Sequence, residues 1–119
     1  MLLLSQIVTG LVLAIHVYIV LLETVLFDSR GKKAFGLSDE AAAIVKPALS
    51  NQGCYNGFLV AALALGLAYP DPVTADAFRL FGLVCVAVAG VWGAVTVKRS
   101  ILLVQTVPAV IALALGWLA

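Results

Sequence analysis

The sequence predicts an all-α, polytopic membrane protein, a single domain of residues 1–119 built as a four-helix transmembrane bundle. Hydrophobic residues make up 64% of the chain and charged residues only 11%, whereas soluble domains have about 45–50% and about 25%. Four apolar stretches each reach about 20 residues, the length with which a helix crosses the hydrocarbon core of a bilayer. The charged residues gather between those stretches, as expected if lipid surrounds the helices.

The first predicted span covers residues 6–27, and a charged run over residues 28–33 ends it. No Lys or Arg precedes Arg30, whereas a secretory signal peptide begins with basic residues and has a shorter apolar core. We therefore expect this segment to be retained as a membrane helix. Helices are the expected form of every span, because lipid cannot satisfy the hydrogen bonds of an open sheet edge.

The connection after the first span contains a signal for the start of a helix. Ser38 is followed by Asp39 and Glu40, and acidic residues are favourable at the positive end of a helix dipole. We expect a short helix that runs toward Lys46, stops at Pro47 and lies on the membrane surface. Alternatively, Pro47 is a first-turn residue of the second span.

Prolines and a basic pair separate the other predicted spans, which cover residues 49–69, 78–97 and 100–119. The second ends at Tyr69-Pro70-Asp71-Pro72, where each proline disfavours a helical conformation of the residue before it. Lys98-Arg99 leaves space for only a tight turn, so the third and fourth spans should be antiparallel neighbours.

The basic residues predict the orientation of the bundle, because cytoplasmic loops of membrane proteins are enriched in Lys and Arg. The second loop holds only Arg79. The first and third loops hold Arg30, Lys32, Lys33, Lys46, Lys98 and Arg99. We therefore expect loops one and three in the cytoplasm, both termini outside, and a multi-pass protein of the cell inner (cytoplasmic) membrane.

Ionisable residues within a span are expensive to insert and often functional. The first span contains His16 and Glu23, which lie seven residues apart on nearly the same helix face, and Thr9 extends this stripe. Counting from Phe27, Glu23 lies about 6 Å and His16 about 16 Å below the cytoplasmic boundary. The stripe therefore places two proton-exchanging groups within the membrane.

Amides of two other spans reach a depth similar to that of Glu23. On the second span, one side of the helix carries Asn51, Gln52, Tyr55 and Asn56. On the fourth, Gln105 lies about 9 Å below the Lys98-Arg99 turn. We expect these groups to face each other and share hydrogen bonds, with Lys98 or Arg99 as a counter-ion for Glu23. The alternative is that the amides only lock the helices together.

Metal and cofactor sites are not expected. The single histidine, His16, has no second ligand at a metal-binding spacing, so a hydrogen-bonded core position is favoured. Cys54 and Cys85 lie in opposite leaflets by helical rise, too far apart for a disulfide, and are interpreted as small apolar core residues. The net charge of +1, without a long basic run, excludes an electrostatic footprint for nucleic acid.

Several short stretches resemble one family of small membrane proteins. They are Ile15-His16-Val17-Tyr18, Lys33-Ala34-Phe35-Gly36, the run from Asn51 to Leu59, the stretch from Gly90 to Thr96, and the stretch from Gln105 to Ala109. Together they resemble domain-of-unknown-function (DUF) family 1304 over nearly the whole chain, and the Asn-Gln-Gly-x-Tyr-Asn-Gly-Phe run is the most specific part. Thr106 departs from the glycine expected there. The resemblance implies four helices and characteristic polar positions at His16, Glu23, Asn51, Gln52, Tyr55, Asn56 and Gln105, but no established activity.

Three functions remain open at this point. The first is a proton or small-solute permeation unit that uses the His16–Glu23 stripe. Because four helices cannot enclose a wide path, it predicts a homo-oligomer in the lipid bilayer. The second is a small membrane enzyme or a protein that binds a small molecule or lipid in a pocket open to the cytoplasmic leaflet. The sequence contains no recognisable nucleophile–base pair, so it indicates no reaction class. The third is a structural or accessory subunit.

Overall fold

The structure is a computed structural model that describes residues 2–118, and all of their regular secondary structure is helical. Met1 and Ala119, the ends of the predicted domain, lie outside the described residues. Five segments are α-helical and two are single π-helical turns, labelled η. In chain order they are α1 (Leu2–Glu23), η1 (Phe27–Gly31), α2 (Lys32–Ala34), α3 (Asp39–Ala68), α4 (Pro72–Thr96), η2 (Leu102–Thr106) and α5 (Val107–Leu118).

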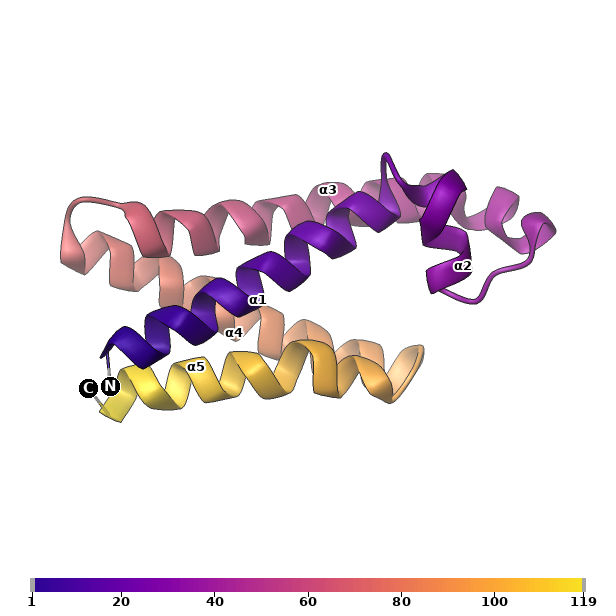
Figure 1. Ribbon diagram of the computed structural model, residues 1–119. Helices are drawn as coiled ribbons and strands as arrows, with labels where there is room; N and C mark the ends of the chain where they lie inside the picture. The colour runs from indigo at the N-terminus through magenta and orange to yellow at the C-terminus, as the bar shows by residue number, and fades with distance from the viewer. Residues whose placement is uncertain (1, 119) are drawn as a thin grey trace.

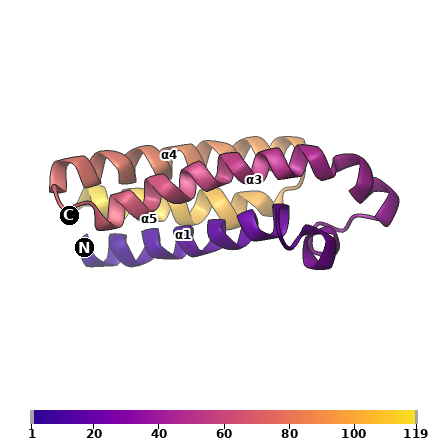
Figure 2. The ribbon, with the colours of Figure 1, turned by 90° about the horizontal axis from the view of Figure 1, so that it is seen from above.

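The long helices form an antiparallel bundle. Helix α1 packs against α3 and α5, and α4 packs against α3 and against the η2–α5 segment, which closes the ring. The start of α1, the end of α5 and the α3–α4 turn lie at one end of the bundle (Figures 1 and 2). The α1–α3 connection and the turn after α4 lie at the other end. The expectation that the last two segments are antiparallel neighbours is therefore confirmed.

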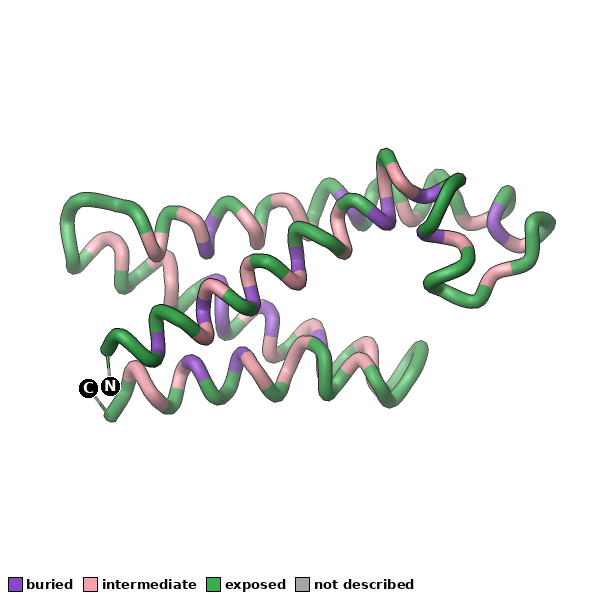
Figure 3. The backbone as a smooth tube through the Cα atoms, viewed as in Figure 1, coloured by how far each residue is buried: buried purple, intermediate pink, exposed green. Residues whose placement is uncertain are grey.

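The centre of the bundle is a small apolar core, and most other surfaces of the helices are exposed (Figure 3). The core is formed by Val12, Leu63, Leu83, Val86, Ala109 and Ala112. Glycines allow the helices to approach closely. A Cβ added at Gly66 would lie 2.7 Å from the Cα of Arg79, and one added at Gly82 would lie 2.9 Å from the side chain of Leu63. This packing fixes α3 against α4.

Helix α3 corrects the predicted break at Pro47. Ser38 is the N-cap, as expected, and its Oγ accepts a hydrogen bond from Ala41 N at 3.1 Å. The helix then continues through Pro47 for 30 residues, so the separate short helix is wrong. Proline removes only the hydrogen bond to the carbonyl of Ala43. Both residues are exposed, so water can satisfy that carbonyl and the helix need not end.

The two π-helical turns also depart from the predicted continuous spans. Helix α1 ends at Glu23, and the following turn has the wider hydrogen-bond spacing, with Gly31 N donating to Leu26 O at 2.8 Å. Turn η2 interrupts the last predicted span before α5 begins. Such turns often occur at functional sites. Both lie at the end of the bundle opposite the start of α1.

Helix α4 begins at Pro72, six residues before the predicted boundary. Asp71 caps it by accepting hydrogen bonds from the hydroxyl of Thr74 at 2.6 Å and from its backbone N–H at 3.0 Å. These bonds, that from the hydroxyl first, hold the pKa of Asp71 below its ordinary value. Proline is favourable here because its missing N–H belongs to the unpaired first turn.

Two helices, α1 and α4, are long and apolar enough to cross a membrane, by length and composition. The segment Leu102–Leu118 is apolar but shorter. Helix α3 is longer than either, and its first half is polar. The chain is therefore all-helical, with two helices of membrane-spanning character.

Candidate functional site

The carboxylate of Glu23 is the centre of the best-defined polar cluster. Glu23 is the last residue of α1 and only 2% exposed. Its Oε2 accepts a hydrogen bond from Gln52 Nε2 at 2.6 Å, and its Oε1 accepts one from Asn56 Nδ2 at 2.7 Å. Gln52 and Asn56 are one turn apart on α3, so both amides reach the same carboxylate.

Gly53 allows this close approach of α3 to α1. A Cβ at this position would lie 2.5 Å from the methyl group of Thr24 and 3.2 Å from the Cβ of Glu23. Any larger residue would push the two helices apart and lengthen both amide hydrogen bonds. The small residue between two amides is thus part of the site geometry.

No cation neutralises Glu23 in the described part of the chain. The ion pairs among the described residues are Lys32–Asp39, Lys46–Asp28 and Arg79–Asp76, and none of them includes Glu23. Lys98 and Arg99 are exposed and form no ion pair with Glu23, so the expected counter-ion contact is not observed. A buried carboxylate held only by neutral amides carries a desolvation cost that an ion pair would have reduced.

His16 lies two turns deeper on the same helix and is fully buried. Its Nδ1 is 2.9 Å from the carbonyl of Val12. Because a carbonyl only accepts, Nδ1 carries a proton, and in the neutral imidazole Nε2 then has the lone pair. Nε2 has no hydrogen-bond partner among the described residues, although buried polar atoms nearly always have one.

All buried polar or charged side chains of the described residues belong to α1: Ser5, Thr9, His16 and Glu23. They follow one face at spacings of four and seven residues. Ser5 Oγ donates to the carbonyl of Ala112 on α5 at 2.8 Å, and Thr9 Oγ1 donates to Ser5 O at 2.8 Å. The stripe of Thr9, His16 and Glu23 is therefore present, and Ser5 extends it to the other end of the bundle.

The remaining predicted site residues are not brought to Glu23. Asn51 and Tyr55 are exposed, and Tyr55 packs edge-on against Phe58 with ring centroids 6.0 Å apart. Gln105 is half-buried with its Cβ against Gly90, and no hydrogen bond joins it to Glu23 in the described chain. Its neighbour Thr106 donates to Ala87 O at 2.9 Å instead. The predicted convergence of three helices is thus a convergence of two.

Arg79 forms a second polar cluster, at the opposite end, that the sequence reasoning missed. From α4, its Nη1 donates to Ser5 Oγ at 2.8 Å and its Nη2 lies 3.4 Å from Asp76 Oδ1. Arg79 falls at the start of the predicted span 78–97, but its charge counts there with the second loop and bears only on orientation. An arginine within an apolar stretch was the signal that would have identified it.

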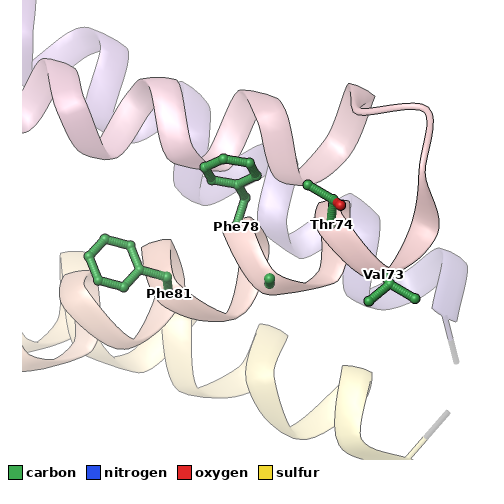
Figure 4. Close-up of a pocket in the computed structure, with 5 residues that line it drawn as sticks. Val73, Thr74, Phe78 and Phe81 are labelled. Carbon is green, nitrogen blue, oxygen red and sulfur yellow. The ribbon is translucent and has the colours of Figure 1, made fainter.

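At the Arg79 end, the described residues line two hollows. The larger, of about 440 Å³, lies on one face of α4 and is lined by Val73, Thr74, Ala77, Phe78 and Phe81 (Figure 4). Its one hydroxyl, that of Thr74, is already bound to Asp71, so it offers no free reactive group. The smaller, of about 180 Å³, is lined by Asp76, Arg79, Leu80, Leu113, Gly116 and Trp117. Among the described residues, no three His, Cys, Asp or Glu side chains are grouped to hold a metal ion.

Fold and site together define a small all-helical protein with a polar stripe on its first helix, facing an apolar interior. The family described as "Protein of unknown function (DUF1304)" matches residues 10–117, and the chain belongs to this family. The resemblance noted in the sequence is therefore confirmed. No curated protein and no solved structure matches the chain.

Proposed function

We propose that the chain is a multi-pass protein of the inner (cytoplasmic) membrane, crossed by α1, α3, α4 and the η2–α5 segment, with both ends outside. Large apolar side chains are exposed on every long helix, as lipid contact would require. The connections at the Glu23 end hold Arg30, Lys32, Lys33, Lys98 and Arg99, whereas the α3–α4 turn holds no basic residue. That distribution supports a cytoplasmic position for the Glu23 end.

Within this membrane protein, the α1 stripe serves as a proton or small-solute permeation path. The observation that carries this proposal is Glu23, a buried carboxylate that forms no ion pair with any of the described residues. A carboxyl group in such a place can take up and release a proton without breaking an ion pair. Intramembrane carboxylates and histidines of this kind are common in proton relays.

The geometry suits proton exchange in steps. In the ionised state, both oxygens of Glu23 accept an amide hydrogen bond. When one oxygen is protonated it becomes a donor, and the amide beside it, that of Gln52 or Asn56, can flip and accept the proton with its carbonyl oxygen. The lone pair of His16 Nε2 is the next acceptor, about 10 Å along α1 by helical rise. That distance requires intervening water or a movement of the helices.

The packed core limits what a single bundle can pass. Val12, Leu63 and Val86 are fully buried between the helices, so a wide path through one copy is closed. A solute larger than a proton would need a path between copies, and a symmetric homo-oligomer is the simplest arrangement.

Flux through liposomes tests the proposal. The full chain is reconstituted with a pH-sensitive dye inside, and proton uptake is followed after a pH jump. Glu23→Gln keeps the shape of the side chain and removes its exchangeable charge, and His16→Ala removes the imidazole. Both should reduce flux, whereas Glu40→Gln, an exposed acid on α3, should not. Unchanged flux in both test variants would refute permeation and favour a structural subunit.

The two alternatives have weaker support. An enzyme or lipophile-binding protein with its pocket at Glu23 would need an opening onto the carboxylate, and Glu23 is only 2% exposed. A structural subunit is favoured by the fact that both Glu23 oxygens already have partners. The unpartnered nitrogen of His16 speaks against pure packing, because a structural role gives no reason to bury it.

A further inference from the structure

Arg79 is held at the first end of the bundle by a set of contacts that leaves part of its guanidinium unused. Its Nη1 donates to the fully buried Ser5, and its Nη2 makes a long contact with Asp76. Gly116 of α5 makes space for the group, since a Cβ there would lie 2.5 Å from Nη1. A guanidinium has five N–H donors, and these two contacts account for two of them among the described residues.

The exposed part of Arg79 faces the smaller hollow, between α4 and α5. The Arg79 side chain is only 13% exposed, whereas that of Asp76 is 67% exposed. Leu80, Leu113 and Trp117 form the apolar part of the lining. The lining of this hollow, whose volume is about 180 Å³, thus combines a cation, an anion and an apolar surface.

The level of this hollow matches the head-group region of a bilayer. Ser5 lies within one turn of the start of α1, and Gly116 within one turn of the end of α5. The guanidinium lies beside both residues, so it is near the membrane boundary rather than the midplane. Trp117 is 90% exposed there, and tryptophan is enriched at such boundaries.

We propose that this hollow binds a zwitterionic, amine-bearing phospholipid of the outer leaflet. Its phosphodiester accepts hydrogen bonds from the N–H groups of Arg79 that have no partner among the described residues, the usual geometry of arginine with phosphate. Its ammonium group donates to Asp76. The first part of an acyl chain lies on Leu80, Leu113 and Trp117.

The charges and the lining favour this lipid over free phosphate. Asp76 repels a phosphate dianion but attracts the amine that a zwitterionic head group carries next to its phosphate. The apolar lining adds contact area that only a lipid uses. The proposal rests on the membrane position given above but not on conduction by Glu23, so lipid retention and proton flux can succeed or fail separately.

Native mass spectrometry of the full chain in detergent micelles tests the proposal. Micelles are supplemented with phosphatidylethanolamine, phosphatidylcholine or phosphatidylglycerol, and the bound fraction is measured. The wild-type chain should retain phosphatidylethanolamine best, because the choline head group has no N–H to donate and the glycerol head group has no cation. Arg79→Gln should weaken this retention about tenfold or more, the scale of a lost charged hydrogen bond.

Two further measurements complete the test. Asp76→Asn should reduce the preference for phosphatidylethanolamine over phosphatidylglycerol, and because Asp76 is exposed, this variant tests the site even where Arg79→Gln fails to fold. Arg99→Gln, an arginine at the other end of the bundle, is the matched control and should retain lipid as the wild type does. Equal retention of all three lipids, no effect of Asp76→Asn, or displacement of lipid by millimolar inorganic phosphate would overturn the proposal.

Discussion

Each end of the bundle holds one largely buried charged side chain, and the hydrogen-bond partners of that side chain differ between the two ends. At the Glu23 end, the carboxylate is 2% exposed and receives only neutral amide donors. At the Arg79 end, the guanidinium remains next to a hydroxyl and an exposed carboxylate. Asp76, 3.4 Å from the guanidinium, offsets part of the charge of Arg79. The carboxylate has two amide donors but no ion pair among the described residues, so uptake of a proton is its way to lose an uncompensated charge.

The largest expected effect separates the roles of the two ends. Glu23→Gln should lower proton flux about a hundredfold, the scale on which removal of a positioned proton-transfer group slows a reaction. Arg79→Gln should lower it less than tenfold, since Arg79 lies beside Ser5, at the opposite end of the bundle from Glu23 (Figure 1). The measurement is dye quenching in liposomes of equal protein content. If both variants lost flux equally, the two ends would belong to one proton path, and the proposed difference between Glu23 and Arg79 would be wrong.

The next effect tests how much the amides stabilise Glu23. Gln52→Leu and Asn56→Leu each remove a hydrogen bond to a charged group, so each should lower the free energy of unfolding by about 1.5–3 kcal/mol. The same changes in a Glu23→Gln background should cost about half as much, because the remaining bond is neutral. Unfolding in mixed detergent micelles measures both. Asn51→Leu, on the exposed side of α3, is the control and should change stability by less than about 0.5 kcal/mol.

A smaller effect is expected at the other end. Ser5→Ala removes the bond to Ala112 O and the acceptor for Arg79, but the partly exposed guanidinium can bond to water instead. The free energy of unfolding should therefore fall by about 1 kcal/mol, the scale of the neutral bond alone. Ser50→Ala, at an exposed position of α3, should leave it unchanged within error. A loss at Ser5 as large as that at Gln52 would show that the two ends are equally dependent on their hydrogen bonds.

The smallest effect concerns the exposed ion pair outside the bundle. The hydrogen bond from Lys46, at 2.7 Å, and the charges of Lys46 and Lys32 hold the pKa of Asp28 below its ordinary value. A lowered carboxyl pKa means that the contact stabilises the fold above the ordinary pKa and is lost as the pH falls through the lowered value. Lys46→Gln should raise the pKa of Asp28 toward its ordinary value, as measured by NMR titration. Lys33→Gln should leave that pKa almost unchanged.

Much of the helical architecture could be predicted because apolar length and charge placement act locally. The cap at Ser38, the turn before Pro72 and the tight turn at Lys98-Arg99 all follow from residue chemistry alone. The contact of Glu23 with Gln52 and Asn56 could also be predicted, since helical rise places all three at one depth. Nothing in the structure tests the expected orientation or the expected transport activity, which stay predictions.

The missed features depend on the helix register and on long-range packing. Turn η2 inserts a wider hydrogen-bond spacing that no residue pattern announces, and counting at 3.6 residues per turn then misplaces Gln105. Pro47 does not end α3, because the outcome depends on whether the freed carbonyl reaches water. Arg79 enters the bundle only because glycines on two other helices, Gly66 and Gly116, leave space for it. None of these is visible within one helix taken alone.

The length of α3 has a mechanical consequence. Its 30 residues extend about 45 Å, well beyond a hydrocarbon core of about 30 Å. The part of α3 before Pro47 is tied to the α1–α3 connection by the Lys46–Asp28 and Lys32–Asp39 pairs. The part of α3 after Pro47 carries Gln52 and Asn56, which bind Glu23. The helix is weakest at Pro47, where one backbone hydrogen bond is missing. A force on the part of α3 before Pro47 would either bend the helix at that proline or rotate Gln52 and Asn56 together, away from Glu23.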